Sequence, residues 1–103
     1  MKVSVVPALI AAGLLLAVAQ GAHASESLAR SKNCLSCHTV DKKVVGPSYK
    51  DIALKYKGKG VEATLARKIR EGGSGTFGSI PMPASPQVSE AEAQQLARWI
   101  LSL

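Results

Sequence analysis

The stretch that decides the fold is Cys34-Leu35-Ser36-Cys37-His38, which reads CLSCH. It holds both cysteines of the chain and one of its two histidines. Two thiols three residues apart are compatible with a disulfide, half of a zinc site, a dithiol redox motif or a haem attachment site. These alternatives require different surroundings, so the rest of the sequence has to decide between them.

The N-terminus has the pattern of a secretory signal peptide. Met1 and Lys2 precede an apolar run over residues 3–19, and Ala22-His-Ala24 fits the A-x-A cleavage pattern. We predict cleavage after Ala24, which removes residues 1–24 and leaves residues 25–103 in the periplasm without stable membrane insertion. The alternative is an uncleaved anchor, but a run of 17 residues is at the short limit for spanning a bilayer.

The expected mature chain is short and basic. Its 79 residues carry 12 of the 13 Lys and Arg residues and all seven acids, for a net charge of +5, and only four aromatic residues. A single domain of this size has a marginal hydrophobic core and commonly needs a disulfide, a metal or a cofactor. The composition therefore predicts an additional source of stability without identifying it.

The periodicity predicts four short helices. The expected ranges are Ser25–Lys32, Pro47–Tyr56, Val61–Glu71 and a last helix that opens at Ser89 with a capping box. No strand pattern, repeat or second domain is visible, so the predicted fold is all-α. The long loop, residues 72–88, is rich in Gly, Pro and Ser, and loops of this length are usually functional.

Only one reading of the cysteines also uses the histidine. A bridge between Cys34 and Cys37 would close a very small loop, a redox CxxC expects a βαβ context, and zinc usually needs four ligands. C-x-x-C-H is the c-type haem attachment pattern. We therefore predict thioether bonds from both cysteines to one covalent haem c, with His38 as the proximal iron ligand.

Met82 is the candidate for the sixth iron ligand. It is the only methionine after residue 24, and it lies between Pro81 and Pro83. Proline excludes the preceding residue from the α region, which makes an extended, stiff segment. The alternative is a methionine that fills the core, but Met/His ligation is the pairing of cytochromes c, and we predict ligation.

The chain resembles the small bacterial class I cytochromes c of the c-551/c-552 type. The resemblance rests on CLSCH, VVGPSYKDIALKY, GTFGSIPMP and VSEAEAQQLARWIL, in this order and with close spacing over residues 25–103. It implies the cytochrome c fold, four short helices around one covalent haem c, with His38 and Met82 as axial ligands. It also implies that the Pro47 carbonyl accepts a hydrogen bond from the His38 ring.

Three residues depart from this family pattern. Phe77 stands where relatives often have tryptophan, Lys68 where some have a propionate-binding arginine, and Ser85 where asparagine is usual. Phenylalanine has no N–H for a haem propionate. We expect weaker fixing of the propionates and a potential that Phe77→Trp would shift.

The function implied is a periplasmic monohaem carrier that moves one electron between redox complexes of a respiratory chain, not an enzyme. The alternative is a haem peroxidase or gas-sensing protein with labile Met82 ligation. A third possibility, a disulfide module without haem, would be excluded by a haemochrome spectrum.

The expected partners are redox proteins, and the chain is expected to be a monomer that binds no nucleic acid. Candidates are a nitrite reductase, a terminal oxidase, a cytochrome c peroxidase or a quinol–cytochrome c reductase. Acidic docking patches on them would complement a group of lysines that otherwise serves as solvated surface charge: Lys42, Lys43, Lys50, Lys55, Lys57 and Lys59.

Overall fold

The computed structural model describes residues 25–103, so the expected signal peptide lies outside the described residues. Residues 25–31 are helical, followed by the 3₁₀ helix η1 (Cys34–Ser36). Three α-helices follow: α2 (Tyr49–Tyr56), α3 (Glu62–Glu71) and α4 (Glu90–Leu101). Over this part of the chain β structure is limited to two isolated bridges. The all-α prediction is confirmed.

Side-chain caps determine where two of the helices begin. In α4 the predicted capping box is present: the Ser89 N–H donates to Glu92 Oε1 (2.9 Å), and the Glu92 N–H donates to Ser89 Oγ (3.1 Å). In α2 the cap is Ser48, whose Oγ accepts from the Asp51 N–H (3.1 Å). The predicted helix start at Pro47 is therefore wrong by two residues, because Ser48 takes the cap position and leaves Pro47 outside the helix.

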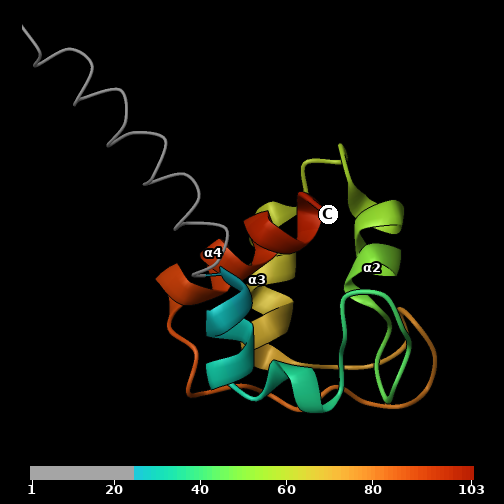
Figure 1. The fold of residues 1–103 in the computed structure, drawn as a ribbon, viewed down its shortest axis with the longest axis horizontal. Coiled ribbons are helices and arrows are strands. Elements are labelled where there is room, and N and C mark those ends of the chain that lie inside the picture. Colours follow the sequence, from blue (N-terminus) through green and yellow to red (C-terminus); the bar gives the residue numbers. More distant parts are fainter. Residues whose placement is uncertain (1–24) are drawn as a thin grey trace, which may run out of the picture.

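The helices pack through small residues. α4 lies against α3 and, over a smaller area, against α2 (Figure 1). Five of the nine buried apolar residues in the described part of the chain are alanines: Ala29, Ala53, Ala66, Ala93 and Ala97. Alanines allow close helix contact but bury little apolar surface each. The core is therefore thin, as the composition predicted.

The long loop crosses one side of the helices. It leaves the end of α3, passes beside α2 and returns to the start of α4 (Figure 1). The Lys55 ammonium on α2 donates to the Thr76 carbonyl (3.2 Å), and the Lys32 ammonium donates to the Gln87 carbonyl (3.0 Å). The loop thereby forms one wall of the molecule. None of the helices described in residues 25–103 has the length and apolar character needed to cross a membrane.

Candidate functional site

A cavity of about 930 Å³ opens between η1, α2, α3 and the long loop. This is in the upper part of the range of about 300–1,000 Å³ for small-molecule and cofactor sites. All eight residues singled out in the sequence line it: Cys34, Cys37, His38, Pro47, Lys68, Phe77, Met82 and Ser85. The structure therefore brings together residues separated by up to 51 positions in the chain.

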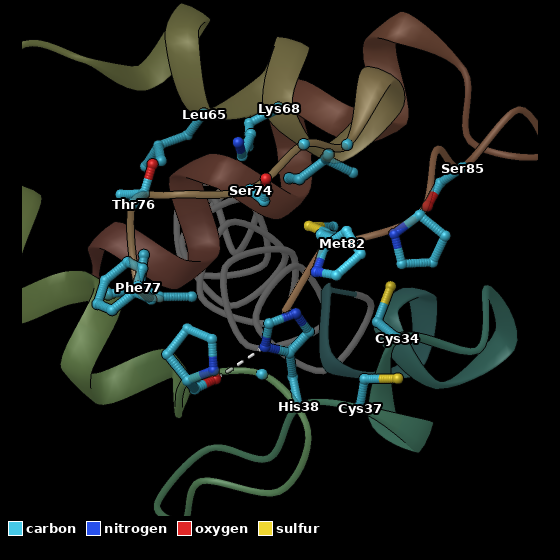
Figure 2. Close-up of a pocket in the computed structure, with 18 of the residues that line it drawn as sticks. Cys34, Cys37, His38, Leu65, Lys68, Ser74, Thr76, Phe77, Met82 and Ser85 are labelled. Carbon is cyan, nitrogen blue, oxygen red and sulfur yellow. Dashed lines mark hydrogen bonds between the residues drawn. The ribbon is translucent and has the colours of Figure 1, made fainter. Parts of the chain in front are cut away.

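The two cysteines enter the cavity from the η1 turn. A left-handed Asn33 (φ 66°) starts this turn, and the N–H groups of Cys37 and His38 both donate to the Cys34 carbonyl, at 3.2 and 3.0 Å. The turn places Cys34, Cys37 and His38 together on the cavity wall (Figure 2). The thiols are free, so the disulfide alternative finds no support.

The surroundings of Cys34 also disfavour a reactive dithiol. Burial raises the pKa of the Cys34 thiol, and the neighbouring Tyr49 hydroxyl opposes this rise only in part. A thiol with a raised pKa is a poor nucleophile at neutral pH, unlike those of redox CxxC motifs. Nor does the described chain contain a cluster of three or more His, Cys, Asp or Glu side chains that could hold a metal ion. Zinc therefore lacks a ligand set there.

His38 is held in one orientation. Its Nδ1 lies 2.7 Å from the Pro47 carbonyl oxygen (dashed line, Figure 2), and because a carbonyl only accepts, Nδ1 carries the proton. Nε2 then keeps its lone pair for a metal. The Tyr49 ring stacks on the imidazole, with centroids 5.2 Å apart and planes 19° apart. The side chain is 9% exposed.

Gly46 is a site residue that the sequence analysis missed. A Cβ at this position would lie 2.5 Å from Cε1 and 2.9 Å from Nδ1 of His38. Only glycine leaves the imidazole room in this place. The Gly46-Pro47 pair was visible in the sequence, but nothing local indicated that Gly46 faces a ring eight residues away.

Met82 reaches the cavity from the long loop (Figure 2). Its backbone pairs with Gly73 in both directions: the Met82 N–H donates to the Gly73 carbonyl (2.8 Å) and the Gly73 N–H to the Met82 carbonyl (2.9 Å). The flanking prolines favour the extended backbone that such a bridge needs. The methionine is thus on a fixed, non-helical segment, as the sequence predicted.

The three departing residues lie along the cavity edge. Phe77 is 41% exposed, and the Lys55 ammonium lies 4.8 Å from its ring centroid. The Lys68 ammonium lies beside Gly73, where a Cβ would be 2.7 Å from it. The Ser85 N–H donates to the Arg70 carbonyl (3.0 Å), which anchors the loop beyond Met82.

The predicted group of lysines is partly engaged within the molecule. Lys50 pairs with Asp41 (2.7 Å), and Lys57 donates to the Leu103 carbonyl (2.7 Å). Lys42, Lys43 and Lys59 are exposed. Asp41 therefore offsets part of the charge of Lys50, whereas the other lysines named here keep theirs at the surface.

The donor set and the walls fit a covalently held haem. Two thiols, one imidazole Nε2 and one thioether converge on the cavity. Its wall also carries an apolar stripe from α3 and its N-cap residue, called here the α3 stripe: Val61, Leu65 and Ile69. These three residues are half-buried, so the cavity has apolar surface for a flat aromatic group to cover. Lys68 supplies a positive charge at its edge.

Comparison with known proteins gives one consistent result. The protein-family model for cytochrome c matches residues 22–103. Cytochrome c-551 of Pseudomonas aeruginosa is 48% identical over 103 residues, covering 99% of this chain and 98% of that protein. Cytochrome c-552 of Nitrosomonas europaea is 54% identical over 89 residues, covering 85% and 86%.

A solved structure agrees with these relatives. The crystal structure of wild-type Nitrosomonas europaea cytochrome c552 superposes with a TM-score of 0.73 at 54% identity, covering 76% of this chain and 98% of that chain. Likeness in sequence and in fold therefore coincides over the described residues.

Proposed function

The chain belongs to the cytochrome c family, and on that premise we propose that it is a periplasmic monohaem electron carrier with His38 and Met82 as its axial ligands. Membership confirms the resemblance to the c-551/c-552 type and with it one covalent haem c and electron transfer as the function. The compartment and the roles of individual residues are our proposals.

The observation that carries the ligand assignment is that His38 and Met82 reach one cavity from two separate segments (Figure 2). When bound, haem supplies a one-electron iron couple, and a methionine ligand raises its potential. Cys34 and Cys37 would hold the group through thioethers. The Pro47 carbonyl would fix the imidazole orientation and increase its basicity.

The remaining residues exclude water and set the charge around the group. The α3 stripe would cover one face, and Phe77 would close the edge next to α2. Lys68 would place a positive charge near a propionate. With His38 and Met82 both as ligands, the iron would have no open position, which would suit electron transfer rather than catalysis.

A spectrum and a redox titration of the exported holoprotein test this proposal. We expect a haemochrome spectrum with one haem per chain, a mature N-terminus at Ser25, and a sulfur-to-iron charge-transfer band in the ferric state. Met82→Ala should lose this band, lower the potential and admit azide. Leu54→Ala, which shortens an apolar side chain that is 82% exposed on α2, is the control and should change none of these.

The alternative of a peroxidase or gas sensor finds no support among the relatives. It would require the wild-type protein to bind azide when ferric, or carbon monoxide when reduced, rapidly and stoichiometrically at neutral pH. That result would overturn the proposal of a closed iron site.

The carrier exchanges electrons with redox partner proteins, and we propose that those partners present acidic docking patches. Nitrite reductases, terminal oxidases, cytochrome c peroxidases and quinol–cytochrome c reductases are the candidate classes. Complementary charge increases association rates and is screened by salt. A reaction rate with the partner that does not depend on ionic strength would contradict this part.

A further inference from the structure

Gly72 lies at the point where the end of α3 meets the backbone of the long loop around Met82. Its own N–H donates to the Lys68 carbonyl (2.8 Å) and ends α3. On its other side, a Cβ at this position would lie 2.8 Å from both Ala84 N and Pro83 C, and closer still to the Met82 carbonyl oxygen. All three are backbone atoms, which cannot move aside as a flexible side chain could.

The surrounding hydrogen bonds depend on this close approach. Gly73 and Met82 exchange two backbone bonds (2.8 and 2.9 Å), and the Ser85 N–H donates to the Arg70 carbonyl (3.0 Å). Gly72 lies between the Gly73–Met82 bridge and the bond from Ser85 to Arg70. Any side chain there would push the segment 82–84 away from α3 and lengthen all three bonds.

The backbone conformation of Gly72 requires glycine as well. Its φ of 72° and ψ of −159° fall in a region that only glycine occupies without strain. Strain alone would explain a glycine at the end of a helix. Strain does not explain the backbone contact with Met82. Most of the other glycines at positive φ in the described chain, such as Gly58 and Gly60, have no atom within 4 Å of an added Cβ.

We propose that Gly72 is a positioning residue for the sixth iron ligand: by admitting the Met82 backbone against the end of α3, it sets where the thioether sulfur stands. This inference rests on the proposed ligation by Met82. It predicts that a substitution at Gly72 weakens the sulfur–iron bond in addition to lowering stability.

The test compares Gly72→Ala with Gly58→Ala in the ferric holoprotein. Gly58 has a similar φ of 77° and open space around its Cβ position, so this control introduces a side chain at positive φ without the contact. The measurement is the rate at which imidazole displaces Met82, read from the loss of the sulfur-to-iron band. We expect an acceleration of at least about tenfold for Gly72→Ala, equivalent to about 1.4 kcal/mol, together with a lower potential, and no change for Gly58→Ala.

Equal behaviour of the two variants at comparable losses of stability would overturn the inference. Absence of the band in the wild-type protein would instead refute Met82 ligation, so the two failures are distinguishable. If Gly72→Ala does not fold, hydrogen exchange of the wild-type holoprotein provides the second test. The amides of Gly73 and Met82 should exchange as slowly as those of α3, and exchange as fast as the rest of the long loop would overturn the inference.

Discussion

His38 is held on three sides by groups of different chemistry. The Pro47 carbonyl accepts a hydrogen bond from Nδ1–H, the Tyr49 ring covers one face, and Gly46 provides the space that the ring occupies. Tyr49 itself contacts the Trp99 ring edge-on at 5.3 Å, which fixes the stack from α4. The orientation of the proximal ligand is thus set by packing as much as by its hydrogen bond.

Gly46→Ala should therefore rotate or displace the imidazole. Relief of the 2.5 Å contact with Cε1 would weaken the hydrogen bond to Pro47, and overpacking of this kind costs about 1–3 kcal/mol. We expect a lower free energy of unfolding in guanidinium and altered electron paramagnetic resonance of the ferric haem. Gly60→Ala, at φ 67° in open space, is the control for the resonance spectrum, because its own backbone strain lowers stability without touching His38. An unchanged resonance spectrum for Gly46→Ala would contradict this account of the contact.

Lys55 joins α2 to the tip of the long loop. Its ammonium donates to the Thr76 carbonyl (3.2 Å) and lies over the Phe77 ring at 4.8 Å. Lys55→Met keeps the aliphatic stem but removes both contacts, and we expect a loss of about 0.5–1 kcal/mol, the value for an exposed cation–π pair. Hydrogen exchange around Thr76 should become faster.

Lys59→Met is the matched control for this prediction. Lys59 is exposed, and its substitution removes the same charge without touching the loop. If both variants exchange alike, the effect is one of net charge and the contact with Phe77 has no structural role. Because Phe77 is one of the three residues that depart from the family pattern, the contact also shows how this chain can hold the ring without a tryptophan N–H.

The residues with a local signature were predictable from the sequence, and those defined by distant contacts were not. Cys34, Cys37 and His38 form a contiguous motif, and Met82 stands out through its flanking prolines. Gly46, Gly72 and Lys55 look like an ordinary loop glycine, helix end and surface lysine. Their importance comes from contacts that no spacing in the sequence encodes.

Helix α4 begins with the most complete start signal in the chain. Hydrogen bonding to the Ser89 N–H lowers the pKa of the Glu92 carboxyl, with a further contribution from Lys32 at 3.4 Å. A carboxyl whose pKa is depressed in the folded state stabilises it above its ordinary pKa of about 4.3 and loses this contribution as the pH falls through the folded value. The capping box thus makes the stability of α4 sensitive to acid.

Glu92→Gln should isolate the contribution of the Glu92 charge to the free energy of unfolding. We expect the wild-type protein to be more stable than the variant at neutral pH, and the two unfolding curves to converge below about pH 4. Ser89→Ala should cost about 1 kcal/mol at neutral pH, as an N-cap substitution does. A difference between wild type and Glu92→Gln that stays constant from pH 7 to pH 3 would contradict the role of the charge.

The presence of each helix could be predicted from the sequence. The residue at which α2 begins could not, because Pro47 and Ser48 are both plausible starting residues. Proline at a first turn made Pro47 a reasonable start, but Ser48 caps α2 instead. The same displacement leaves the Pro47 carbonyl outside the helix ladder, where it accepts from His38. The error in the boundary and the contact at the site thus have one physical cause.

At the scale of the whole molecule, the helices bury little apolar surface among themselves. Alanines make up most of the core, and Val61, Leu65 and Ile69 line the cavity of about 930 Å³ and are only half-buried. Leu65 and Ile69 also pack against the edge of the core. Chains of this size commonly rely on a cofactor for stability. The covalent haem is therefore expected to fill this cavity and to complete the hydrophobic core.

The double variant Cys34→Ala/Cys37→Ala, freed of haem by extraction, tests this expectation. Without the group, the α3 stripe would face water, and we expect no cooperative unfolding transition and a large loss of helical circular dichroism relative to the wild-type holoprotein. Added haem should restore part of the helical signal, because His38 and Met82 remain. A haem-free variant that unfolds cooperatively with wild-type helix content would mean that the alanine-rich core is sufficient, and that the cofactor contributes redox chemistry but not the fold.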